Sequence, residues 1–250
     1  MKTVIKRLFL LISILTIWQV ISIFANPIFI PSPKDVFSAM LEMISNGQLL
    51  IAMMYSLRRI FVATIISSLV AFPVALLIYN SKIAYDILHP IISTLRYVPV
   101  TAFYPLLIMW FGIEESMKVA FLFIATFVYM MPSVILCLDE INQDLIDTGL
   151  TLGMSRFQTI TKIQIPACLP SVMNSFIMMI GIGFTYIAVC EQINAVKGLG
   201  YIIQQSSARG RTDLVFMGIM VIMILSFIID NFANKLVQKV FKWRYLDDRN

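Results

Sequence analysis

The chain has 250 residues, of which 59% are hydrophobic and only 13% are charged. A soluble domain carries about 25% charged residues, so this composition indicates a membrane protein. The 19 basic residues outnumber the 14 acidic ones, but they are dispersed along apolar segments, which argues against a nucleic-acid partner. The three cysteines, Cys137, Cys168 and Cys190, are far apart. Because His89 is the only histidine, we expect this chain to bind no metal and no cofactor by itself.

Windows free of charged residues predict the membrane spans, because a spanning helix needs about 20 apolar residues, within a range of about 17 to 25. Five windows reach that length, and a sixth between Asp213 and Asp230 reaches it if either carboxylate lies at the interface. We therefore expect an all-α integral membrane protein with a single transmembrane domain over residues 1–250 and about six spans. The predicted spans are about 8–25, 60–80, 97–113, 118–138, 170–190 and 214–234.

The first window is also compatible with a cleaved signal peptide, because Lys2, Lys6 and Arg7 precede an apolar core. That core runs from Leu8 to Ala25 and is longer than the usual 7 to 15 residues, roughly, of a signal peptide. An uncleaved span is therefore the favoured interpretation. The amphipathic segment 34–46 that follows is expected to lie along the membrane surface.

The distribution of basic residues predicts the orientation. With the N-terminus in the cytoplasm, both termini and the polar loop 139–165 lie inside. The cytoplasmic side then receives 12 basic residues: Lys2, Lys6, Arg7, Lys82, Arg96, Arg156, Lys162, Lys235, Lys239, Lys242, Arg244 and Arg249. The opposite side receives seven: Lys34, Arg58, Arg59, Lys118, Lys197, Arg209 and Arg211.

The polar loop 139–165 contains the signals of a short helix. Asp144 and Asp147 suit a helix N-terminus, where carboxylates complement the free backbone amides. Leu145, Ile146, Leu150 and Leu152 form an apolar stripe at helical spacing. Gly153 permits a left-handed residue at the helix end.

A second helix is expected from Ser155 through Ile165. Pro166 and Pro170 follow it and are expected to reset the backbone before the fifth span. From spacing alone the loop could equally be an ordinary connector lying on lipid headgroups.

The run DLIDTGLTLGMSRFQTITKIQIPACLP resembles the cytoplasmic EAA loop of ABC importer permeases, which carries Glu-Ala-Ala, then a central Gly, then Ile-x-Leu-Pro. Asp147, Thr148 and Gly149 take the Glu-Ala-Ala positions, where Asp keeps the charge while Thr and Gly are poorer helix formers. The resemblance implies that the ATPase-coupling residues are Asp144, Asp147, Thr148, Gly149, Leu152, Gly153, Met154, Ser155, Arg156, Pro166 and Pro170.

The resemblance extends over nearly the whole chain and points to the nitrate, sulfonate, taurine and bicarbonate branch. Its other segments are 29–33 (FIPSP), 56–59 (SLRR), 95–112 (LRYVPVTAFYPLLIMWFG), 198–201 (GLGY) and 211–216 (RTDLVF).

The resemblance implies a type I (MetI-like) ABC importer permease in the bacterial plasma membrane. The permease pairs with a second copy of itself, two ATPase subunits dock on the coupling helices, and an extracytoplasmic binding protein delivers a small solute. That solute would be a sulfonate, taurine, nitrate or similar anion, or a vitamin precursor. The chain contains no G-x-x-x-x-G-K-[ST] motif, so ATP and Mg would be bound by the partner ATPase and the chain would not be an enzyme.

Four residues are candidates for the translocation path or its gate: Arg96, Tyr97, Pro99 and Glu191. Pro99 predicts a broken helix, and broken helices can expose backbone polar groups to a substrate, although kinked packing is an equal alternative. Glu191 ends a charge-free run, so it either faces the path or marks the membrane interface. Arg58 and Arg59 are expected to extend to the outer interface.

A stand-alone proton-coupled carrier or a membrane-embedded enzyme is the main alternative function. An enzyme needs a constellation of catalytic groups, and the carboxylates near the span ends form no such motif. A carrier commonly shows repeated halves, and the sequence contains no internal repeat.

Overall fold

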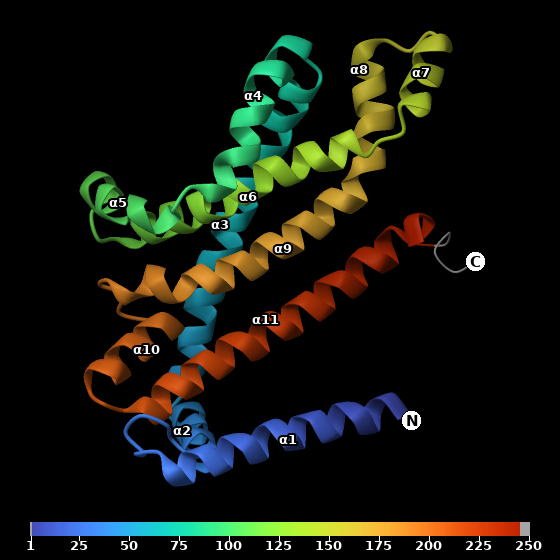
Figure 1. Cartoon of the computed structure of the whole chain (residues 1–250). Coiled ribbons are helices and arrows are strands. Elements are labelled where there is room, and N and C mark those ends of the chain that lie inside the picture. Colours follow the sequence, from blue (N-terminus) through green and yellow to red (C-terminus); the bar gives the residue numbers. More distant parts are fainter. Residues whose placement is uncertain (1, 246–250) are drawn as a thin grey trace. The chain divides into compact units, whose positions relative to one another are not determined.

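The computed structural model describes residues 2–245, and all regular secondary structure in that range is helical (Figure 1). The predicted all-α class is therefore confirmed. The chain forms two compact units, one made of the residues up to Arg58 with Ile187–Leu225 and one made of Arg59–Tyr186 with the residues from Ser226 onward. Three long helices contribute to both units: α3 (Gln48–Tyr79), α9 (Ile165–Gln192) and α11 (Thr212–Val240).

The first unit joins α1 (Lys2–Phe24) to the start of α11 through aromatic packing. The Trp18 ring stacks on Phe216 with a centroid separation of 6.0 Å. The Trp18 indole Nε1–H donates to the Pro31 carbonyl at 3.1 Å. Because an indole N–H needs a partner when it is partly buried, this bond also fixes the loop that follows α1.

The amphipathic segment predicted at 34–46 forms α2 (Pro33–Ser45). Ser32 and Asp35 make a reciprocal capping box, in which each backbone N–H donates to the other residue's side chain at 3.2 Å. Val36, Ala39 and Met43 are buried on one face, as a helix with an apolar stripe requires. The position of this helix on the membrane surface stays a prediction.

The second unit packs α6 against α3 and α9 through small and flexible side chains. Its other helices are α4 (Lys82–Thr94), α5 (Tyr104–Phe111), α6 (Glu115–Asp139), α7 (Gln143–Thr151) and α8 (Arg156–Thr159). Ala71 and Ala75 of α3 are fully buried in one core cluster with Met130 of α6 and Met179 of α9. Small residues one turn apart let membrane helices approach closely, and methionine fills the remaining irregular space.

Among residues 2–245, four helices are long and apolar enough to span a membrane: α3, α6, α11 and the continuous run Arg156–Gln192. A fifth span results if α4 and α5 count as one bent pair. The predicted six is not exactly confirmed: within α1, the apolar stretch Leu8–Phe24 counts as a shorter apolar helix, and it ends before Asn26 and Pro27.

The helix that contains the predicted second span, 60–80, is longer than that span, since α3 begins at Gln48. Arg58 and Arg59 lie inside the helix because charged side chains do not interrupt helical hydrogen bonding and arginine is a good helix former.

The predicted third span, 97–113, is not one helix. The 3-10 turns Leu95–Tyr97 and Val100–Phe103 precede α5, and the two halves of the pair are bent by 88°. Pro99 lies between the two turns, where it cannot donate a backbone hydrogen bond and restricts Val98 to an extended conformation. The prediction that this region is broken is confirmed.

Candidate functional site

The loop between α6 and α9 begins with the capped helix α7. The Asn142 side chain caps it by accepting from the Asp144 backbone N–H at 2.9 Å. Asp144 lies in the first turn, where its carboxylate complements the helix dipole. The sequence predicted both Asp144 and Asp147 at the helix start. Asp144 lies in the first turn and Asp147 lies beyond it, and the structure adds Asn142 as the cap.

The end of α7 is a Schellman motif centred on Gly153. The backbone N–H of Gly153 donates to the Leu150 carbonyl and that of Met154 to the Gly149 carbonyl, both at 3.0 Å. Gly153 has a φ of +82°, which only glycine adopts without strain. The predicted turn at Gly153 is therefore confirmed.

The segment that leads from α7 to α9 begins with a second capping box, which starts α8. The Ser155 backbone N–H donates to the Gln158 side chain at 2.9 Å, and the Gln158 N–H donates back to Ser155 Oγ at 3.3 Å. Residues Ile160–Gln164 then form one π-helical turn that leads directly into α9.

The expectation that Pro166 and Pro170 reset the backbone is wrong, because helix runs continuously from Arg156 to Gln192. The Ile165 N–H donates to the Ile160 carbonyl, five residues back. This wider turn shifts the carbonyls that a following proline ring would otherwise contact.

The three residues at the Glu-Ala-Ala positions differ in exposure. Asp147 and Thr148 are exposed, and the Thr148 hydroxyl donates to the Asp144 carbonyl at 2.6 Å. Gly149 is buried, and a Cβ there would lie 2.5 Å from Ile163 Cδ1. Of the three Glu-Ala-Ala positions, only the third, Gly149, thus packs closely against the segment that leads into α9.

The apolar stripe predicted for α7 divides between two faces. Ile146 packs against the core cluster of the second unit. Leu145, Leu150 and Leu152 are exposed, and Leu152 is 76% exposed. Phe157 in α8, which sequence reasoning missed, is 73% exposed, and Arg156 beside it is also exposed. The loop therefore presents apolar side chains flanked by charges.

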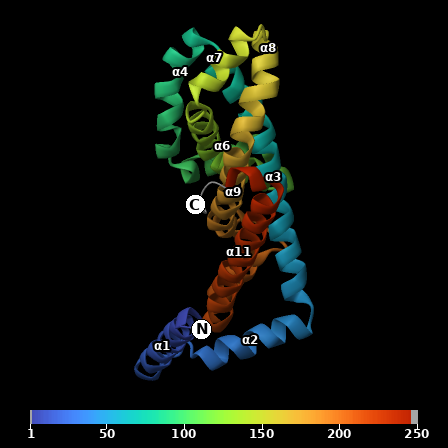
Figure 2. The same ribbon diagram turned by 90° about the vertical axis from the view of Figure 1, so that its right-hand side faces the viewer.

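Three polar pairs tie this loop to the ends of α3 and α4, and none of them was predicted. Asn80 and Gln164 exchange amide hydrogen bonds at 2.9 and 3.1 Å. The Tyr85 hydroxyl donates to the Asp139 carboxylate at 3.0 Å, and Gln143 Nε2 donates to the Tyr79 hydroxyl at 3.3 Å. Figures 1 and 2 show α7 and α8 side by side at the same end of the second unit as α4.

The path candidates Arg96, Tyr97 and Pro99 lie together at the break between α4 and α5. The Arg96 guanidinium lies over the Tyr97 ring at 5.9 Å from its centroid, and Arg96 Nε donates to the Ser93 carbonyl at 3.2 Å. Both Arg96 and Tyr97 are exposed, so their assignment to the path stays a prediction.

Glu191 belongs to the first unit, and its side chain is 0% exposed. Ser56 Oγ donates to its carboxylate at 2.8 Å, and the Gly200 backbone N–H donates to it at 2.8 Å. The Leu199 N–H donates in turn to Ser56 Oγ at 2.9 Å. In this structure the carboxylate therefore fixes the start of α10 (Leu199–Ala208) and does not lie at the surface.

Sequence reasoning missed two buried cations in the second unit. Arg59 was expected to extend to the interface but is 2% exposed and forms an ion pair with Glu115, to which its Nε donates at 2.8 Å. Lys118 is equally buried and donates to the Ile113 carbonyl at 3.2 Å. Both side chains fix the turn before α6. Windows free of charged residues cannot reveal such buried cations, because they treat every charge as a boundary of a span.

Comparison with known proteins identifies the family. The model of the binding-protein-dependent transport system inner membrane component matches residues 63–242. The chain is 29% identical to the taurine transport system permease protein TauC of Escherichia coli (strain K12), over 92% of this chain and 86% of that protein. It is 27% identical to the putative aliphatic sulfonates transport permease protein SsuC of Bacillus subtilis (strain 168), over 96% and 87% respectively.

Two solved structures share the fold. The inward-facing MetNI methionine ABC transporter aligns with a TM-score of 0.67 at 20% identity, over 77% of this chain and 96% of that chain. A bacterial alginate ABC transporter, solved with its alginate-bound periplasmic protein, gives 0.66 at 17% identity, over 96% and 98%. The chain belongs to the family of binding-protein-dependent transport system inner membrane components, and is a transport component and not an enzyme.

Proposed function

We propose that this chain forms the translocation path of an ATP-driven importer. A partner ATPase would bind α7 together with the segment 152–165 that connects it to α9. The assembly would contain two copies of this chain, two ATPase subunits that hold ATP and Mg, and an extracytoplasmic binding protein. Both termini and α7 would lie on the cytoplasmic side of the bacterial plasma membrane, in agreement with the excess of basic residues there.

The observation that carries the proposal is the exposed face of a rigidly held helix. Leu145 and Leu150 of α7 and Leu152 at its C-terminal cap are exposed. Exposure of such side chains costs free energy that burial would recover, about 1.5–3 kcal/mol each. Three capping motifs and three polar pairs fix the backbone beneath them. A helix held in this way transmits motion from a bound partner into α6 and α9 without first having to fold.

The transported solute is proposed to be a small organosulfonate. This follows from the relatives, since the permeases named for taurine and aliphatic sulfonates align over most of their length. The selectivity would be set largely by the binding protein.

The test is copurification of the ATPase with a variant of the exposed face. Leu152→Arg places a desolvated charge in the proposed contact, and loss of one buried leucine weakens an interface by about 10- to 100-fold. We expect this variant to insert normally, to lose the ATPase and to lose solute uptake. Ile28→Arg is the matched control, because Ile28 is also exposed but lies in the loop after α1. Retention of the ATPase by Leu152→Arg at the wild-type level would refute the docking role.

A further inference from the structure

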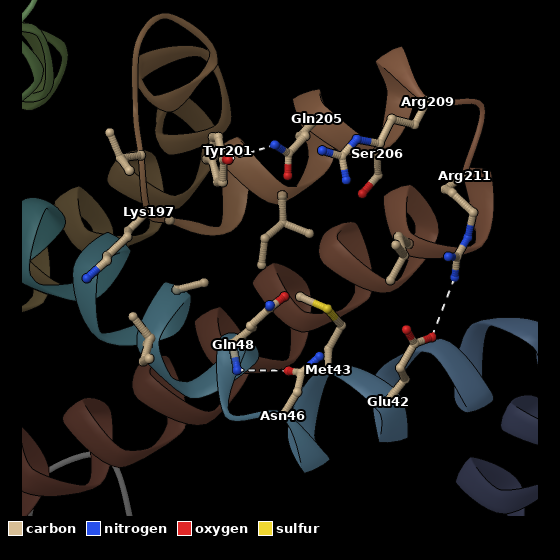
Figure 3. A pocket seen from close by; sticks show the side chains of 16 residues that line it. Glu42, Met43, Asn46, Gln48, Lys197, Tyr201, Gln205, Ser206, Arg209 and Arg211 are labelled. Atoms are coloured by element: carbon tan, nitrogen blue, oxygen red, sulfur yellow. Dashed lines mark hydrogen bonds and ion pairs between the residues drawn. The ribbon is translucent and has the colours of Figure 1, made fainter.

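The first unit contains a cavity of about 520 Å³ that the proposed function does not use. Its walls come from α2, the start of α3 and the segment 196–214, including α10 (Figure 3). Asn46, Gln48, Tyr201 and Gln205 supply polar groups to its lining. A volume of this size, with mixed polar and apolar walls, is typical of a small-molecule site.

The charges that line the cavity are predominantly positive, with Lys197, Arg209 and Arg211 against Glu42. Arg211 is neutralised locally, because it pairs with Asp213 at 2.7 Å and with Glu42 at 3.6 Å. Lys197 turns toward α3, where its Nζ lies 5.2 Å from the centroid of the Tyr55 ring (Figure 3). Neither of these two cations is therefore the main anchor.

Arg209 differs from both. Among the described residues its guanidinium has no ion pair and no side-chain hydrogen bond, and only its backbone N–H is engaged, with the Ser206 carbonyl. Figure 3 shows its side chain reaching back from the end of α10 toward Ser206. A guanidinium with five donors suits the flat or tetrahedral oxygens of a carboxylate or sulfonate.

Part of the lining is apolar and held in place. Met43, Ile51 and Ile202 line the cavity, and Met43 and Ile202 are buried. The start of α10 is fixed by the bonds of Leu199 and Gly200 to Ser56 and Glu191. A wall fixed before the ligand arrives reduces the entropy lost on binding.

We propose that this cavity is a binding site for a small organic anion, with its charged head at Arg209 and its apolar body against Met43 and Ile202. The site lies wholly within one copy of the chain. It is independent of the ATPase contact, so its absence would leave the proposed function intact and loss of ATPase docking would leave this site intact.

Protection of an introduced cysteine tests the proposal directly. The chain, with its three native cysteines replaced and in complex with its ATPase, is placed in nanodiscs of zwitterionic lipid. Gln205→Cys lines the cavity, and Gln204→Cys is the matched control, because the neighbouring side chain is exposed and lies outside the lining. We expect hexanesulfonate to slow maleimide labelling of Gln205→Cys in a saturable manner and to leave Gln204→Cys unchanged, whereas hexanol should protect neither.

A second pair of variants identifies the anchor. Because a charge-assisted hydrogen bond is lost, Arg209→Gln should raise the hexanesulfonate concentration for half-protection by about tenfold. Arg58→Gln removes an exposed cation of the same unit that does not line the cavity, and it should leave that concentration unchanged.

Three results would overturn the proposal. One is labelling of Gln205→Cys that hexanesulfonate does not slow. Another is equal protection in the Arg209→Gln and wild-type backgrounds. The third is protection of Gln205→Cys without hexanesulfonate, by the purified binding protein alone or by added phosphatidylglycerol alone. The occupant of the cavity would then be a protein segment or a lipid headgroup.

Discussion

The returns at residues 143–165 and 191–213 connect long helices, yet they bury opposite kinds of side chain. In the first, Leu152 is 76% exposed while the polar Gln164 is 4% exposed. In the second, the carboxylate of Glu191 is 0% exposed and accepts hydrogen bonds from Ser56 and Gly200. Each return therefore departs from the usual rule that apolar groups are buried and charges exposed.

The two departures have different consequences. An exposed apolar face leaves free energy to be gained when a partner covers it. A buried carboxylate is tolerated only with its hydrogen bonds intact, so it stabilises its own unit and offers nothing to a partner. Changes in the first return should thus affect assembly and changes in the second should affect stability.

The largest effect should come from Glu191→Ala. It removes the acceptor for Ser56 and Gly200 and leaves their donors buried, at about 1–3 kcal/mol for each unsatisfied group. We expect a clear fall in the thermal unfolding temperature of the purified protein. Asp147→Ala removes an exposed carboxylate from the other return. Because Asp147 lies beyond the first turn of α7, the loss of helix-dipole interaction should cost at most a few tenths of a kcal/mol, roughly. Equal unfolding temperatures for the two variants would contradict the claim that the second return contributes more to stability than the first.

A smaller and purely local effect is expected from Gly153→Val. A β-branched residue at a φ of +82° stores about 1–3 kcal/mol of strain and redirects α7, while the long helices keep their own backbone bonds. We expect normal membrane insertion but loss of ATPase copurification and of transport.

Gly47→Val is the control for Gly153→Val. Gly47 has a φ of +73° and equally open surroundings, but it follows α2. This control should retain the ATPase, and retention by both variants would contradict the role given to the first return.

The smallest effect concerns the contact of Gly149 with Ile163. Gly149→Ala places a Cβ 2.5 Å from Ile163 Cδ1, whereas alanine is the better helix former by about 1 kcal/mol. Ile163→Val deletes that methyl group. We expect the double variant to exceed Gly149→Ala in ATPase copurification and in unfolding temperature. Additive effects of the two changes would show that this contact does not position α7.

Local backbone signals explain what could be predicted. The acidic first turn of α7, the glycine at its end and the broken helix at Pro99 each depend on residues within one or two turns. The charge-free windows located both ends of α6 and the start of α11 to within a few residues, because charges bound them in the sequence. The end of α11 was missed, because the helix continues past Asp230 to Val240.

Side-chain pairs distant in sequence account for the rest. Ser56 and Glu191 are 135 residues apart, and Asn80 and Gln164 are 84 apart, so no periodicity relates them. The same limit applies to Arg59, whose partner Glu115 comes 56 residues later. The π turn at Ile160–Gln164, which continues the helix past Pro166, likewise was not predicted from the local sequence.

The most direct test of the docking role is crosslinking from α7 itself. A single cysteine at Leu152, in a chain without its native cysteines, is coupled to a photoactivatable maleimide in the assembled complex, and the captured peptide is identified by mass spectrometry. The same reagent at Ser207, an exposed residue of the second return, serves as the reference. We expect Leu152→Cys to capture the ATPase and Ser207→Cys to capture none of it. Capture of lipid alone from Leu152→Cys would mean that this loop is a membrane-surface connector and would contradict the central claim.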